Sequence, residues 1–72
     1  MNKEEIDKIV ALNLNIECPL SSDISMLNTV EWDSLAYMSI LSQLEEKSNR
    51  KVSTLQAYKL QSLKGIYEVF MI

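Results

Sequence analysis

Apolar residues recur along this chain at the spacing of an α-helix. Two segments place them at positions i, i+3, i+4 and i+7, which marks one buried helix face in each. These residues are Tyr37, Ile40, Leu41 and Leu44 in one segment, and Leu63, Ile66, Tyr67 and Phe70 in the other. A weaker apolar stripe begins at Ile6 and predicts an N-terminal helix with one apolar face that extends as far as Leu14. The pattern therefore predicts three main helices.

Residues that cap helices stand where these stripes begin. Asn2 followed by Glu5 fits the reciprocal capping arrangement of a helix start. Asp33 and Ser62 precede the other two stripes and are strong N-cap candidates, because their side-chain oxygens accept hydrogen bonds from a first helical turn. With Asp33 as the cap, Ser34 is the first residue of its helix.

The segment from Asn15 to Glu31 has no sustained period, so it is expected to be a long connection. Its six apolar residues are more than a solvated loop needs, and we expect the segment to lie across the helices and contribute to the core. They are Ile16, Leu20, Ile24, Met26, Leu27 and Val30. A short helix is expected from Thr54 to Lys59. The predicted fold is all-α: one domain over residues 1–72, a four-helix bundle of three main helices plus a short third helix.

Two residues suggest how the helices are positioned. Trp32 stands just before the predicted cap and Tyr37 lies four residues into the helix, the spacing of a hydrophobic staple that would aim Ser34. Gly65 inside the last helix costs about 1 kcal/mol relative to Ala, which favours a site of close helix packing.

The net charge of −3 is unevenly distributed. Residues 1–46 carry nine acids against two lysines, whereas residues 47–72 carry five basic residues against Glu68 alone. The acidic part should repel nucleic acid and suit basic protein partners. We see no signal peptide and no apolar run of membrane-spanning length, so we expect a cytoplasmic protein that binds no nucleic acid and no membrane.

The chain contains no histidine and one cysteine, Cys18. Because no nucleophile–base pair can be built without histidine, we do not expect an enzyme. A single cysteine excludes an internal disulfide and a cysteine-cluster metal site, and we expect Cys18 to be a small, partly buried apolar residue. Ser34 is therefore the main candidate for a residue to which a chemical group is attached, since orphan amides and the macrodipole at a helix start favour a phosphate.

Asp33-Ser34-Leu35 opens the second predicted helix, and Glu45 and Glu46 stand near its end. With this motif, this order of helices and this length, the sequence resembles the acyl carrier proteins over nearly all of the chain. The resemblance implies that Ser34 carries 4′-phosphopantetheine through a phosphodiester, added by a phosphopantetheinyl transferase. The terminal thiol of that group would hold acyl or aminoacyl groups as thioesters.

The same resemblance assigns roles to the neighbours of Ser34. Asp33 would cap the helix and help to orient the magnesium-bound cofactor during transfer. Acyl-activating or acyl-transferring partner enzymes would contact four residues of the second helix. These are Leu35, Met38, Glu45 and Glu46.

Other positions depart from the carriers of fatty-acid synthesis. Those usually have acids two and five residues after the serine and a methionine eight after, where this chain has Ala36, Ser39 and Ser42. Ser48 replaces the aromatic residue usual near the end of that helix. With Trp32 before the motif, the sequence resembles stand-alone carriers that are encoded with polysaccharide, modified-sugar or natural-product enzymes. We therefore expect a stand-alone carrier of a specialised biosynthetic pathway.

Two alternatives remain open from the sequence. An aminoacyl or peptidyl carrier would use the same serine for a different cargo. A small helical interaction module would keep the carrier fold without the modification. In each case we expect a monomer, because all the apolar stripes are needed for one small core.

Overall fold

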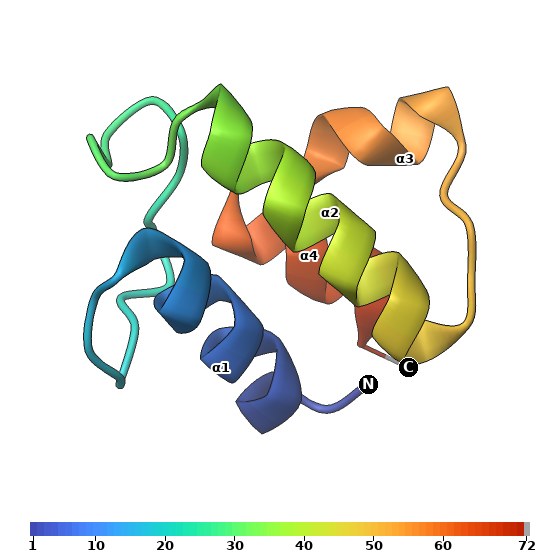
Figure 1. The fold of residues 1–72 in the computed structure, drawn as a ribbon, viewed down its shortest axis with the longest axis horizontal. Helices are drawn as coiled ribbons and strands as arrows, with labels where there is room; N and C mark the ends of the chain where they lie inside the picture. The colour runs from blue at the N-terminus through green and yellow to red at the C-terminus, as the bar shows by residue number, and fades with distance from the viewer. Residues whose placement is uncertain (72) are drawn as a thin grey trace.

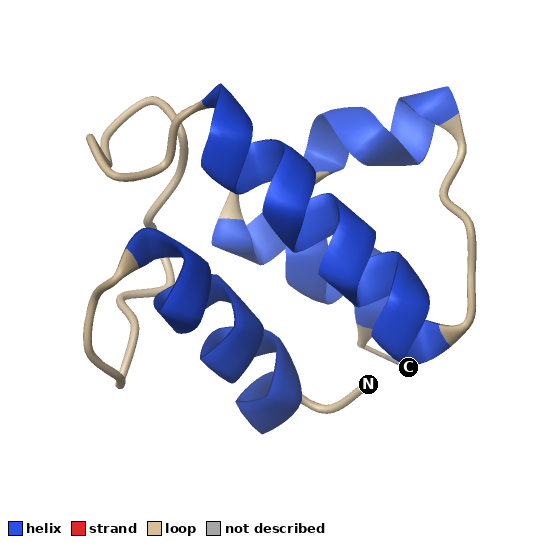
Figure 2. Cartoon of the chain, viewed as in Figure 1, coloured by secondary structure: helices blue, strands red, loops and turns tan. Residues whose placement is uncertain are grey.

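The computed structural model describes residues 1–71 and contains four α-helices over that range. They are α1 (Lys3–Leu14), α2 (Ser34–Ser48), α3 (Thr54–Lys59) and α4 (Leu63–Phe70), drawn in Figures 1 and 2. The prediction of an all-α chain is confirmed, and the predicted helix starts are correct. None of the four helices is long and apolar enough to cross a membrane.

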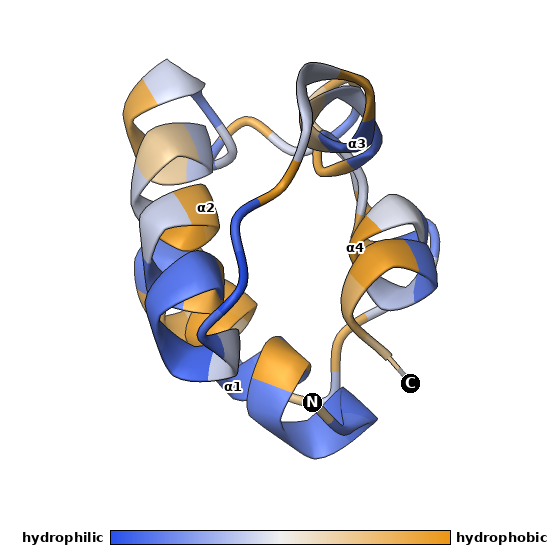
Figure 3. Cartoon of the chain, turned by 90° about the vertical axis from the view of Figure 1, so that its right-hand side faces the viewer, coloured by the Kyte–Doolittle hydropathy of each residue, from blue (hydrophilic) through white to orange (hydrophobic). Residues whose placement is uncertain are grey.

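The helices enclose one hydrophobic core. In Figure 1, α1 lies beside α2, and α4 lies behind α2; α4 also contacts α1 and α3. Figure 3 shows the apolar faces of α1, α2 and α4 turned towards one another. The buried cluster is made of Ile6, Val10, Leu14, Trp32, Ala36, Ile40, Leu44, Leu60, Leu63, Ile66, Val69 and Phe70. Tyr37, Leu41 and Tyr67, which we predicted to be buried, lie at its edge and are partly exposed.

The capping residues act as predicted. Asn2 Oδ1 accepts a hydrogen bond from the Glu5 amide at 2.8 Å, while Glu5 Oε1 accepts one from the Asn2 amide at 3.1 Å, so the reciprocal capping arrangement is confirmed. Helices α1 and α2 end at Asn15 and Asn49, each with a φ of 56°. Asparagine tolerates this left-handed conformation better than most residues, which explains why both helices end where they do.

Gly65 lies where α4 meets the end of α3. A Cβ atom at this position would lie 1.7 Å from the carbonyl oxygen of Lys59, a distance that no real contact allows. Since Gly65 leaves room for that carbonyl, α3 and α4 approach more closely here than any other residue would permit. The prediction of close packing at Gly65 is confirmed.

The long connection is only partly packed. Its apolar residues Ile16, Leu20, Ile24 and Met26 pack against the core. Two backbone hydrogen bonds fix it to the α3–α4 junction, from the Met26 amide to the Gln61 carbonyl at 2.9 Å and from the Leu63 amide to the Ile24 carbonyl at 3.1 Å. The prediction is wrong for Leu27 and Val30, whose exposed fractions are 99% and 95%.

Asn28 explains why Leu27 and Val30 point outward. Its Oδ1 accepts a hydrogen bond from the Ser25 amide at 2.9 Å, and its Nδ2 donates to the Asp23 carbonyl at 2.9 Å. These bonds curl the chain into a tight turn on its own side chain. A turn closed in this way holds its neighbouring side chains on the outside.

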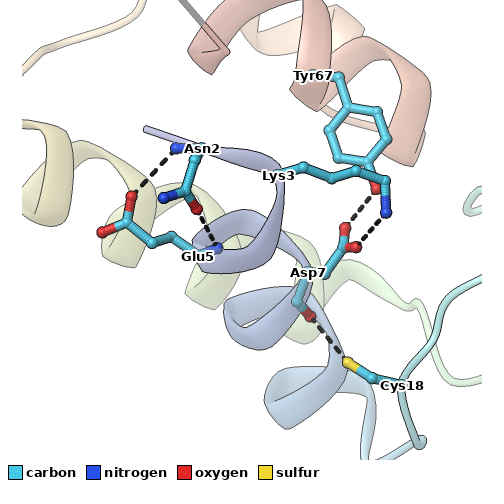
Figure 4. Close-up of polar contacts among 6 residues, drawn as sticks. All are labelled: Asn2, Lys3, Glu5, Asp7, Cys18 and Tyr67. Carbon is cyan, nitrogen blue, oxygen red and sulfur yellow. Dashed lines mark hydrogen bonds and ion pairs between the residues drawn. The ribbon is translucent and has the colours of Figure 1, made fainter.

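A polar cluster that the sequence did not reveal joins α1 to α4 (Figure 4). Asp7 is buried; its carboxylate accepts a hydrogen bond from the Tyr67 hydroxyl and pairs with Lys3 Nζ at 2.7 Å. Desolvation, followed by the hydrogen bond to Asp7, raises the pKa of Tyr67 above its usual value. The cluster thus satisfies a buried carboxylate while it connects two helices.

Cys18 lies close to this cluster but is not buried. Its Sγ is 3.9 Å from the Asp7 carbonyl oxygen, and the residue is exposed on the connection after α1 (Figure 4). The prediction that Cys18 would be partly buried is therefore wrong. Residues 17–19 are exposed, while Ile16 and Leu20 on either side of them pack against the core.

Candidate functional site

The start of α2 presents Ser34 on a capped helix end. Asp33 has an extended backbone, and its Oδ1 accepts a hydrogen bond from the Ala36 amide at 2.9 Å. The Asp33 carbonyl accepts from the Tyr37 amide at 2.9 Å, so the first turn is closed. Ser34 is the first residue of the helix and is exposed. The predicted roles of Asp33 as the cap and Ser34 as the first helical residue are both confirmed.

Buried neighbours on both sides hold the backbone of Ser34 in place. Trp32 is 2% exposed, and Ala36 is buried on the next turn. The Trp32 amide also donates to the Thr29 carbonyl at 2.9 Å, which ties the residue to the preceding turn. Trp32 is therefore part of the core, and Tyr37 packs against the same core; a direct staple contact between the two side chains stays a prediction. Ser34 is thus an exposed residue between two that are packed into the core.

The electrostatic environment of Ser34 is set by the start of α2 and by the capping carboxylate of Asp33. The first N–H groups of a helix lack intrahelical acceptors, and the macrodipole places partial positive charge there. No acidic side chain lies in the first turn of α2 itself. The unpaired N–H groups and the macrodipole both favour a phosphate attached to the Ser34 hydroxyl. Asp33 directs its carboxylate to the Ala36 amide, which partly offsets its charge.

Large exposed apolar side chains gather on the segments around Ser34. Leu27 and Val30 come from the connection, and Leu35 and Met38 from the outer face of α2. Residues 9–46 contain six acids and no basic residue, so these apolar side chains lie on an acidic part of the chain. Exposed apolar groups of this size mark interaction sites when they are contiguous.

The predicted partner-binding residues do not form one cluster. Glu45 and Glu46 lie 11 and 12 residues along α2 from Ser34, which at about 1.5 Å per residue separates them by roughly 17 Å along the helix axis. Glu46 is exposed. The Glu45 side chain is only 19% exposed, and its Oε2 accepts a hydrogen bond from the Val52 amide at 2.9 Å. Glu45 therefore holds the α2–α3 connection, a structural use that its position in the sequence did not predict.

A hollow of about 500 Å³ lies directly beside Ser34. Its lining combines the turn of the connection with the start of α2: Met26, Leu27, Asn28, Thr29, Val30, Trp32, Asp33 and Ser34. The sequence did not reveal this hollow. The available signal was the cluster of turn-forming residues around Leu27, which is typical of a curled loop rather than of a packed one.

Metal ligands do not converge in the described part of the chain. No group of three or more cysteine, aspartate or glutamate side chains that could hold a metal ion is found within residues 1–71.

No protein-family model matches this chain, and no curated protein is significantly similar to it. The function of the Ser34 region must therefore be inferred from its geometry and from the sequence resemblance described above.

Proposed function

We propose that this chain is a carrier protein of the acyl carrier type, with Ser34 as the attachment site for 4′-phosphopantetheine. The observation that supports this most directly is an exposed serine hydroxyl on the first residue of a rigidly anchored helix. On this proposal the four helices form the bundle of that family, and the protein works as a cytoplasmic monomer in a specialised biosynthetic pathway.

The residues at the start of α2 fit the proposed group. A phosphodiester on Ser34 would lie at the positive end of α2, near first-turn amides that need acceptors. The hollow beside Ser34 offers both apolar and polar walls, as an extended chain of amides and methyl groups requires. When attached, the group supplies the thiol that holds an acyl cargo as a thioester.

The attachment step assigns Ser34 the role of nucleophile. Ser34 Oγ would attack the pantetheine-bearing phosphate of coenzyme A, and a new O–P bond would form as the bond to adenosine 3′,5′-bisphosphate breaks. The serine proton would pass to a base of the transferase. Asp33 would hold the helix start in position and help to orient the magnesium-bound donor.

Partner enzymes would contact the apolar residues close to Ser34. Leu35 and Met38 are both exposed on α2, where they stand at the start and the end of the first turn after Ser34. Glu46, at the far end of the helix, would add a charged contact for a basic partner, although exposed ion pairs contribute little affinity each. Glu45 would contribute less, because it already accepts a hydrogen bond within the chain.

The proposal is tested by intact mass after co-expression with a broad-specificity phosphopantetheinyl transferase. We expect a gain of one phosphopantetheinyl group in the wild type and in Ser42→Ala, an exposed serine on the same helix, and no gain in Ser34→Ala. A wild-type chain that gains no mass, or a gain that persists in Ser34→Ala, would refute the proposal.

The exposed apolar residues around Ser34 also fit the second candidate, an unmodified interaction module. That candidate requires partner binding by a chain that carries no group on Ser34. Within the carrier proposal, an aminoacyl or peptidyl cargo competes with a fatty acyl one. Loading the modified chain with candidate acids and their adenylating enzymes distinguishes the two cargo classes.

A further inference from the structure

One wall of the hollow beside Ser34 is a turn closed by side-chain hydrogen bonds. The Asn28 side chain closes the turn through its bonds to Ser25 and Asp23. The Leu27 and Val30 side chains extend from this turn and are almost fully exposed, yet both line the hollow. A ligand that covers apolar side chains exposed to water lowers the free energy of the bound state.

Trp32 provides a second, independent observation at the same place. It lines the hollow, and its indole N–H is buried without an acceptor among the described residues. A buried donor that lacks a partner is costly, so most such donors in proteins are satisfied. The indole N–H is covered in this structure, so a small shift of the indole or of the turn would bring it to the surface of the hollow, where a carbonyl oxygen would remove that cost.

We propose that this hollow is a binding subsite for the pantetheine portion of the group on Ser34, with Leu27 and Val30 covering its methyl groups and Trp32 Nε1 as the donor for an amide carbonyl. This inference rests on the attachment proposed above. Ser34 itself lines the hollow, so an attached chain begins inside it. A tethered ligand has an effective concentration on the order of mM, and weak contacts are then enough to populate the subsite.

The other side of α2 offers a competing place. A smaller hollow of about 240 Å³ is lined by Tyr37 and by residues of α3 and the following turn: Thr54, Ala57, Tyr58 and Gln61. Ser34 does not line it, and the Tyr37 hydroxyl donates to the Ala57 carbonyl at 2.9 Å across it. The Tyr37 hydroxyl proton already has an acceptor, whereas the buried indole N–H of Trp32 has none among the described residues.

Nuclear magnetic resonance of the isotope-labelled chain, before and after modification, tests the subsite. Modification is first verified by intact mass. We expect nuclear Overhauser effects between the pantetheine methyl protons and the methyl groups of Leu27 or Val30. We also expect a shift of the indole N–H resonance, which is unambiguous because Trp32 is the only tryptophan. Attachment alone perturbs residues next to Ser34, so the methyl contacts are the decisive measurement.

Two matched variants complete the test. Val30→Ser removes an exposed wall of the hollow and should reduce the methyl contacts and the indole shift several-fold. Leu55→Ser changes a residue on α3 that is 80% exposed and should leave both signals unchanged. The inference is overturned if the modified chain shows contacts only with Tyr37 or residues 54–61, or none with the hollow. An absent mass gain instead refutes the attachment itself.

Discussion

Replacing Gly65 by alanine sets two physical effects of opposite sign against each other. Helix propensity alone predicts that Gly65→Ala stabilises α4 by about 1 kcal/mol. The new Cβ, however, would lie 1.7 Å from the Lys59 carbonyl oxygen and 2.7 Å from its carbonyl carbon. Both atoms belong to the backbone, so the end of α3 must move away as a whole.

The steric effect should be the larger one. Overpacking in a close-packed core costs typically about 1–3 kcal/mol, and more where backbone must shift. Even after the gain in propensity, we expect Gly65→Ala to lower the free energy of unfolding by about 2 kcal/mol. A domain of this size loses roughly 4–8 °C of Tm per kcal/mol, so Tm should fall by roughly 8–16 °C.

Urea unfolding measures this loss, with Trp32 fluorescence and far-ultraviolet circular dichroism as two probes. Trp32 is the only tryptophan and is buried, so its emission reports on the core. Lys64→Ala, an exposed neighbour on the same helix, is the matched control and should stay within about 0.5 kcal/mol of the wild type. Unchanged or increased stability of Gly65→Ala would show that the contact between α3 and α4 does not constrain the fold.

Three further predictions concern polar groups. Tyr67→Phe removes a hydrogen bond to the buried Asp7 carboxylate and should lower the free energy of unfolding in urea by about 1.5–3 kcal/mol. Tyr58→Phe, on the exposed face of α3, should change it by nearly nothing. Equal effects of the two variants would contradict the role of the cluster. Burial and the hydrogen bond to Asp7 raise the pKa of Tyr67 above its usual value of 10. The stabilisation by Tyr67 is therefore complete below pH 10 and is lost as the pH rises through the folded-state pKa. Tm measured between pH 9 and pH 11.5 should fall more steeply in the wild type than in Tyr67→Phe. Asp33→Ala should lower stability by about 1 kcal/mol through the lost cap, while Asp33→Ser should restore it. If Asp33→Ser restores stability but not the mass gain on modification, the carboxylate itself acts in the transfer.

The helices were predictable because the signals that define them are local. A stripe of apolar residues, a capping side chain and a breaking residue all lie within a few positions of one another, as at Asn2 and Glu5 or at Asp33. Gly65 was interpretable for a related reason, since a glycine inside a strong helical stripe needs a packing explanation. The same locality placed Ser34 at an exposed helix start.

The remaining features depend on contacts between distant residues. Asp7 and Tyr67 are 60 positions apart, so no local pattern shows that they meet. Glu45 looks like a surface carboxylate until the backbone of Val52 returns to it. The exposure of Leu27 and Val30 follows from a turn closed by Asn28, whose effect on neighbouring side chains cannot be obtained from their hydrophobicity.

The alternation between Trp32, Ser34 and Ala36 has a consequence for how such a protein changes over generations. Trp32 and Ala36 face the core, while Ser34 and Leu35 between them face outward. Substitutions at the outward positions leave the packing of the inward residues intact. Selection for a new partner is therefore largely independent of selection for folding. On the proposed function, the preference for partners at the start of α2 can therefore diverge quickly on an unchanged scaffold.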